Sequence, residues 1–404
     1  MEEYRTYTLE ELSIGKGSYG IAASAVPFDS SLHTYLRITD INDDGTLNKS
    51  GLMSVDEDEA GKYLLKPNDI VFARTGNSTG RSYFYDCSDG ELVYAGFLIK
   101  FSLDSAKVNP RILKYYTHSK PYYDWVQSFG TGSTRGNINA KTYGNMPITL
   151  PPRDIQDKIV DVLKSLDDKI DVNSRINDNL EQQAQALFKS WFVDFEPFKN
   201  GEFVESELEM IPRGWRVGAL SEIADITMGT SPAGTSYNVT GEGDVFYQGR
   251  AEFGFRFPHR NMYTSEPKRF AEIDSVLLSV RAPVGDINVA EERCCIGRGL
   301  ASVRSNKGMN SYILYLMKSL NSVFDQFNGE GTVFGSINKK ALEQVPVIIP
   351  REEDISKFDK ICKPIDKQIK NIEQESRRLA ELRDTLLPKL MSGELKVNEI
   401  EDVL

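Results

Sequence analysis

The sequence is poor in the residues from which metal sites and disulfide frameworks are built. It has 404 residues but only four cysteines and three histidines. No two cysteines have C-x-x-C spacing and the histidines are scattered, so the pattern predicts free thiols in a reducing compartment and no zinc site. The residues concerned are Cys87, Cys294, Cys295, Cys362, His33, His118 and His259.

Long apolar runs are also missing. No stretch approaches 18 consecutive apolar residues, and the acidic N-terminal segment MEEYRTYTLEEL contains no apolar run. Neither a transmembrane helix nor a signal peptide is therefore predicted. We expect a cytoplasmic protein with no membrane partner.

The common motifs of catalysis are absent as well. There is no G-x-x-x-x-G-K-[ST] phosphate loop, no Asp/Asn-Pro-Pro-Tyr motif of amino-methyltransferases, and no carboxylate pair with a nearby lysine typical of nucleases. We expect no catalytic residue, no metal and no cofactor in this chain. The net charge is −11, concentrated in residues 151–215, so a nucleic-acid face would need a partner to supply much of the phosphate attraction.

What the chain does contain is an internal repeat at an offset of 199 residues. QSFGTGSTRGNINAKTYGNMPITLPP (127–152) matches QFNGEGTVFGSINKKALEQVPVIIPR (326–351) without a gap, and weaker echoes with a shifting offset lie upstream. The repeat predicts the order globular, helical, globular, helical. The expected segments are 1–150 (globular), 151–198 (long helix and aromatic end), 199–211 (linker), 212–350 (globular), 351–395 (long helix) and 396–404 (tail).

Two long helices are predicted from apolar residues that recur at three- and four-residue steps. Each apolar stripe is narrow and favours a partner helix, and the obvious partner is the repeat, so we expect an antiparallel coiled coil; two independent surface helices are the alternative. Polar Asn173 and Ser376 in the seam would help to fix its register. The predicted seam consists of Ile159, Leu163, Leu166, Ile170, Leu180, Leu187, Trp191, Phe358, Ile365, Ile369, Leu379, Leu386 and Leu390.

The globular parts have the pattern of mixed α and β structure. Short β-rich runs, for example at 69–73 and 346–349, lie between turn residues, and a helix is expected at about 109–127 with its copy at 309–326. The fold class is therefore α+β, with two globular domains, two long helices and an internal pseudo-twofold repeat.

The loops carry side chains suited to binding. RTGNSTGR (74–81) and TGSTRGNIN (131–139) combine arginine, asparagine, serine and threonine with glycine, and GTVFGSINKK (331–340) is the second copy. Such groups contact phosphates and read base edges, although the glycines and small polar residues could equally form plain surface turns.

An aromatic cluster, FKSWFVDFEPF (188–198), closes the first long helix. Trp191 continues the apolar seam and is expected to pack against the partner helix. Phe192, Phe195 and Phe198 lie beyond the seam. They are candidates either to cap the helix end against a globular domain or to dock a partner protein.

These features together resemble the specificity (S) subunits of type I restriction–modification enzymes. The resemblance covers essentially the whole chain, and its specific parts are the Pro-Pro entry to the first helix, SWFVDF (190–195) and KLMSGEL (389–395). It implies that each globular part is a target recognition domain that reads one half of a split site in double-stranded DNA. The long helices would then be a spacer between the two halves.

The resemblance also implies a set of partners. Two methyltransferase (M) subunits would bind S-adenosylmethionine, and two restriction (R) subunits would use ATP and Mg. This subunit would have no activity of its own. The residues expected to contact the first half-site are Arg74, Asn77, Thr79, Arg81, Thr134, Arg135 and Asn137, and those for the second are Arg281, Arg298, Thr332, Ser336 and Asn338.

A second hypothesis comes from a different class of protein. The helices could mediate oligomerisation and the loops could bind protein, which would make the chain a coiled-coil scaffold without specific DNA binding. Salt-dependent DNA binding in the presence of partners separates the two hypotheses.

Overall fold

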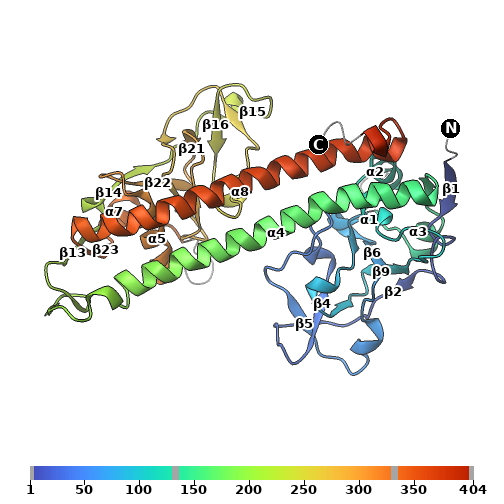
Figure 1. The fold of residues 1–404 in the computed structure, drawn as a ribbon, viewed down its shortest axis with the longest axis horizontal. Helices are drawn as coiled ribbons and strands as arrows, with labels where there is room; N and C mark the ends of the chain where they lie inside the picture. Colours follow the sequence, from blue (N-terminus) through green and yellow to red (C-terminus); the bar gives the residue numbers. More distant parts are fainter. Residues whose placement is uncertain (1–3, 130–135, 329–334, 400–404) are drawn as a thin grey trace. The chain divides into compact units, whose positions relative to one another are not determined.

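The computed structural model describes residues 4–129, 136–328 and 335–399 (Figure 1). The chain divides into two compact units that do not follow its linear order. Unit 1 comprises Met1–Ile170 and Arg378–Leu404, and unit 2 comprises Asp171–Arg377. Each unit therefore contains one globular body and a segment of both long helices. We call the globular parts body 1 (within residues 1–150) and body 2 (within residues 212–350).

Body 1 is built from short strands in three sheets of its described residues. Their orders are β1-β10, β2-β9-β6-β7 and β3-β5-β4-β8, with β4 and β8 parallel. The strands are β1 (Arg5–Thr8), β2 (Ser18–Tyr19), β3 (Ala25–Val26), β4 (His33–Leu36), β5 (Met53–Val55), β6 (Asp69–Ala73), β7 (Ser82–Phe84), β8 (Leu92–Tyr94), β9 (Leu98–Ser102) and β10 (Pro147–Leu150), and the helices are α1 (Ile112–Tyr116), α2 (Lys120–Gln127) and α3 (Ala140–Gly144).

Body 2 repeats this topology, with one additional strand, β18, at the edge of its third sheet. Its sheets have the orders β13-β23, β14-β22-β19-β20 and β15-β17-β16-β21-β18, with β16 and β21 parallel. The strands are β13 (Arg216–Ala219), β14 (Ala224–Met228), β15 (Tyr237–Asn238), β16 (Asp244–Tyr247), β17 (Tyr263–Thr264), β18 (Phe270–Ala271), β19 (Val276–Ser279), β20 (Ile287–Val289), β21 (Cys294–Ile296), β22 (Leu300–Ser305) and β23 (Pro346–Ile349), and the helices are α5 (Asn310–Ser319), α6 (Asn321–Asp325) and α7 (Lys339–Glu343). A hairpin of β11 (Phe203–Glu205) and β12 (Met210–Pro212) precedes it.

The long helices are α4 (Arg153–Phe192) and α8 (Glu352–Ser392). They contact each other within each unit, and the contacts run antiparallel. In unit 2, Phe188 and Trp191 near the end of α4 lie 5.7 and 6.2 Å from Phe358 near the start of α8. In unit 1, Asp167 near the start of α4 pairs with Arg383 near the end of α8, at 2.9 Å. The alternative of two independent surface helices is therefore wrong.

The predicted seam residues are all withdrawn from solvent. Those that are buried are Ile159, Leu163, Leu166, Phe358, Ile369, Leu386 and Leu390, and those that are half-buried are Ile170, Leu180, Leu187, Trp191, Ile365 and Leu379. Many of them also pack on a body: Leu163 and Leu386, for example, share one core with Phe101 and Tyr143. Regular coiled-coil interlocking along the helices stays a prediction.

Polar residues interrupt the apolar contact between the helices in unit 2. Asn173 is 1% exposed, and its amide donates to Glu375 at 2.8 Å and to Ser376 at 3.2 Å. Asn177 is also buried and donates weakly to the carbonyl of Ile369 at 3.5 Å. Asn173 and Ser376, which the sequence places in the seam, therefore meet, and their bond is available only in this register of the two helices.

The aromatic end of α4 belongs to the core of unit 2. Phe192 and Phe195 are about 6% and 5% exposed and lie 5.7 and 5.6 Å from the ring of Trp215. Phe198 is half-buried and lies 4.8 Å from the same ring. Their rings fill the junction between the helix end and body 2, as the capping alternative expects. Docking of a partner by these three phenylalanines stays a prediction.

Candidate nucleic-acid interface

In body 1, two of the predicted binding loops are joined by backbone hydrogen bonds. The chain leaves β6 at Arg74, whose N–H donates to the carbonyl of Phe97 at 3.1 Å and whose carbonyl accepts from the N–H of Ile138 at 3.0 Å. Thr75 and Asn137 form an antiparallel bridge beside these bonds. The loops 74–81 and 136–139, and the turn that carries Phe97, therefore form one surface.

Body 2 has the same arrangement at the end of β19. The N–H of Val280 donates to the carbonyl of Gly299 at 2.9 Å, and its carbonyl accepts from Ile337 at 3.1 Å. Arg281 and Ser336 form the corresponding bridge. We call these two hydrogen-bonded arrangements the loop frames. They align Arg74 with Val280, so the counterpart of Arg281 in body 1 is Thr75.

A close backbone approach holds a further strand end beside each loop frame. A Cβ atom at Gly20, just after β2, would lie 2.2 Å from the carbonyl oxygen of Tyr94, and one at Gly229, just after β14, would lie 2.1 Å from that of Gly297. Only glycine fits at such a distance. The residues before them, Tyr19 and Met228, are thus fixed at equivalent places beside the loop frames.

The predicted DNA-contacting residues fall into four groups. Asn77, Asn137, Arg281, Arg298 and Ser336 are exposed on or beside the loop frames. Arg74 is half-buried, with its guanidinium 5.0 Å from the centre of the Tyr19 ring. Thr134, Arg135 and Thr332 lie outside the described residues. DNA contact by each of these residues stays a prediction.

The fourth group consists of residues that already have partners within their own body. Arg81 donates to the carbonyl of Ile41 at 3.1 Å and pairs with Asp43 at 2.6 Å. The hydroxyl of Thr79 donates towards the carbonyls of Gly76 and Gly136, and the side chain of Asn338 caps α7 by accepting the N–H of Ala341. These bonds account for Arg81, Thr79 and Asn338 as structural residues, and a role in reading DNA would have to be additional.

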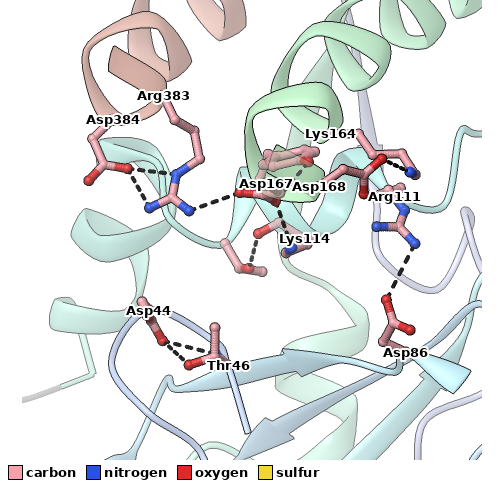
Figure 2. A network of polar contacts seen from close by, with 12 residues as sticks. Asp44, Thr46, Asp86, Arg111, Lys114, Lys164, Asp167, Asp168, Arg383 and Asp384 are labelled. Atoms are coloured by element: carbon pink, nitrogen blue, oxygen red, sulfur yellow. Dashed lines mark hydrogen bonds and ion pairs between the residues drawn. The ribbon is translucent and has the colours of Figure 1, made fainter. Parts of the chain in front are cut away.

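A different set of polar side chains, centred on Asp167, attaches body 1 to the long helices. Asp167 of α4 is buried and accepts hydrogen bonds from Lys114 and Tyr115 of α1, at 2.7 and 3.0 Å, and from Arg383 of α8, at 2.9 Å. Figure 2 shows Asp167 between Lys114 and Arg383. One carboxylate thus connects three helices within unit 1.

The counterpart in unit 2 stands at the repeat position, 199 residues later. Asp366 of α8 accepts from Tyr315 of α5 at 2.7 Å and from Arg256 at 2.7 Å. Arg256 is only 2% exposed and also pairs with Glu181 of α4, which in turn pairs with Lys318. The tyrosine–aspartate bond is therefore common to both units, whereas its arginine comes from α8 in unit 1 and from a loop of body 2 in unit 2.

The carboxylates that attach the two bodies to the helices are stabilised in their ionised forms. Burial alone would raise the pKa of Asp167, but Lys114 and Arg383 outweigh it and hold that pKa below its usual value. Burial acts on Glu181 in the same way, and Arg256 and Lys318 lower its pKa to about 2. Both carboxylates are therefore charged at neutral pH, and they keep the bodies attached to the helices.

The repeat also produces two similar clefts. In unit 2, a cleft of about 480 Å³ is lined by Gln185, Phe188 and Lys189 of α4 and by Tyr315, Lys318 and Ser319 at the end of α5. In unit 1, a cleft of about 530 Å³ is lined by the corresponding residues of α8 and body 1, Asp384, Leu387, Pro388, Tyr115, His118 and Ser119. The chain thus presents the same kind of surface twice.

Two kinds of feature are missing from the part of the chain that the structure describes. No helix in this part of the chain is long and apolar enough to cross a membrane. Within the same residues, no group of histidine, cysteine, aspartate or glutamate side chains is arranged to hold a metal ion.

The two bodies share one backbone arrangement at their loop frames but carry different side chains on it. Each body is also attached to the paired helices. This is the architecture of a protein with two related recognition domains. Comparison with known sequences shows its family. The family profile described as the type I restriction modification DNA specificity domain matches residues 29–182 and 212–383. The chain therefore belongs to this family and is a type I restriction–modification specificity subunit with two target recognition domains, body 1 and body 2.

Individual relatives agree with this assignment. The inferred MjaX specificity subunit of a type I restriction enzyme from Methanocaldococcus jannaschii is 30% identical over 85% of this chain and 82% of its own length. The HindI specificity subunit from Haemophilus influenzae is 25% identical over 96% of this chain and 99% of its own. The crystal structure of an S subunit from M. genitalium has the same fold, with a TM-score of 0.55 at 16% identity over 96% of each chain.

Proposed function

We propose that this chain reads a split DNA sequence for a methyltransferase and endonuclease complex and has no catalytic activity of its own. Body 1 reads one half-site and body 2 the other, while α4 and α8 set the gap between them. The observation that carries this proposal is the duplicated loop frame: the backbone bonds recur in both bodies, but the side chains on them differ. Such an arrangement suits two different half-sites. It supports DNA recognition over a scaffold without it.

The proposal assigns the chemistry to partner subunits. Two M subunits bring S-adenosylmethionine, two R subunits use ATP and Mg, and this chain binds none of these cofactors. The net charge of −11 supports a role for partners in holding DNA, because phosphate attraction requires basic surface that this chain lacks overall.

The test is binding and methylation by the chain with and without its M subunits. The target is first identified from methylated adenines in the host genome by long-read sequencing. We expect the complete complex to bind that site tightly, with log affinity falling linearly as log salt rises. Scrambling either half-site should abolish tight binding. Methyl transfer by the isolated chain, or equal affinity for the scrambled sites, would contradict the proposal.

The two similar clefts are the proposed places for the two M subunits, since a repeated surface can bind two copies of one partner. Gln185→Trp blocks one cleft and Asp384→Trp the other. We expect native mass spectrometry to show one bound M subunit with either variant and none with both. Gln183→Trp, an exposed position on α4 outside the cleft lining, is the matched control. Two M subunits bound to the double variant would rule out these docking places.

A further inference from the structure

One exposed aromatic residue stands on the loop frame of body 1 without a structural explanation. Phe97 is 60% exposed, although the backbone around it is held firmly. Its carbonyl accepts from Arg74, and the next N–H, that of Leu98, donates to Ala95 at 2.8 Å. The ring is therefore presented to solvent by an ordered turn between β8 and β9. An apolar ring that stays 60% exposed gains little from folding.

The side chains next to Phe97 on the frame are those expected of a DNA contact. Arg74 follows β6 and places its guanidinium over Tyr19, which is 42% exposed and whose hydroxyl accepts the N–H of Ala140 at 3.1 Å. Asn137 is exposed on the adjoining loop. An arginine, an asparagine and two aromatic rings thus come from hydrogen-bonded neighbours on one surface.

The second body shows that the fold does not need the aromatic ring. The backbone bond from Arg74 to Phe97 has its counterpart in the bond from Val280 to Gly299. Glycine therefore stands where body 1 has Phe97, and the exposed side chain of that turn is instead Arg298, one position earlier. The same frame carries an apolar group in one body and a cation in the other, as expected where two bodies recognise different sequences.

We propose that Phe97 is a specificity-determining residue that contacts the C5-methyl group of a thymine in the major groove of the first half-site. The inference rests on the proposed function. Phenylalanine cannot hydrogen-bond to a base edge, and thymine alone presents a methyl group among the four bases in the major groove. The alternative contact for such a ring is a wedge between base steps in the minor groove, which would respond to the flexibility of the step and not to a methyl group.

The test removes the methyl group and the ring separately. Each thymine of the first half-site is replaced in turn by uracil, which lacks only the methyl group, and affinity is measured for the complete complex. We expect one position at which uracil weakens wild-type binding about fourfold, the effect of losing one buried methyl group. With Phe97→Ala the same replacement should have no effect. Phe28→Ala, 58% exposed in the same body, is the control and should retain the uracil effect.

The outcomes separate this inference from the function on which it rests. If the wild-type complex binds its split site specifically but no thymine responds to uracil, or if Phe97→Ala retains the response, the inference fails and the proposed function stands. A first half-site without any thymine on either strand would also overturn it. If the wild-type complex shows no specific binding, both fail. Unchanged assembly of the Phe97→Ala chain with M subunits confirms that the variant is folded.

Discussion

The charge of Glu181 depends on its surroundings. Its carboxylate is buried between Arg256 and Lys318, and its pKa falls from an ordinary 4.5 to about 2. A lowered pKa in the folded state means that the ion pair stabilises unit 2 fully above pH 4.5. That stabilisation is lost as the pH falls from about 4.5 towards 2, because the unfolded chain takes up the proton first.

We therefore expect the free energy of unfolding of unit 2 to fall steeply over this pH range, and the Glu181→Gln variant to show a much smaller slope. Urea unfolding is followed by tryptophan fluorescence in a Trp125→Phe background, so that only Trp191 and Trp215 of unit 2 report. Glu207→Gln, at an exposed position, should retain the wild-type slope. Parallel pH profiles for wild type and Glu181→Gln would show that the pair contributes nothing.

At the scale of elements, each body is attached to the helices by an equivalent tyrosine–aspartate bond. Tyr115→Phe removes the bond to Asp167 in unit 1, and Tyr315→Phe removes the bond to Asp366 in unit 2. Hydrogen bonds to charged groups stabilise by about 1.5–3 kcal/mol. We expect each variant to lower hydrogen-exchange protection in its own unit only, so each serves as the control for the other. A loss of protection shared equally by both units would contradict this assignment.

The long helices could be predicted from sequence because their signal is local. An apolar stripe at helical spacing needs no knowledge of the rest of the chain, and α4 and α8 lie within a few residues of the predicted bounds. The two prolines of the second helix, Pro364 and Pro388, do not interrupt α8. The topology of the bodies could not be predicted, because it depends on pairings between short strands far apart in sequence.

The contacts at the aromatic end and in the loops could not be predicted, for one shared reason. Phe192 and Phe195 pack on Trp215, which lies beyond the linker, and nothing near them in sequence indicates that partner. Arg256 lies 75 residues from Glu181, so the sequence does not indicate this charge network either. The exposed tip at Phe97 could not be predicted, because a single phenylalanine in a β-rich run is usually part of a core.

At the scale of the whole molecule, the repeat predicts that the bodies are interchangeable parts. Replacing residues 1–150 with body 1 of another specificity subunit should change one half of the methylated sequence and leave the other half intact. The donor must retain a tyrosine at the position of Tyr115, because that residue attaches the body to α4. Long-read sequencing of methylated adenines measures the result. Changes in both half-sites would contradict the proposal that each body reads its half independently.

The core of unit 1 combines residues from early and late in the described chain, and this affects how the protein is made. This core includes Leu9 and Leu12 from the start of the sequence and Leu386 and Leu390 from the end of α8. During synthesis, unit 2 is complete once residue 377 has left the ribosome, whereas the core of unit 1 has to wait for the last segment of α8. Body 1 is therefore translated first but is the last to finish folding. A premature stop codon that removes the last segment of α8 would disrupt the core that contains Leu9 and Leu12.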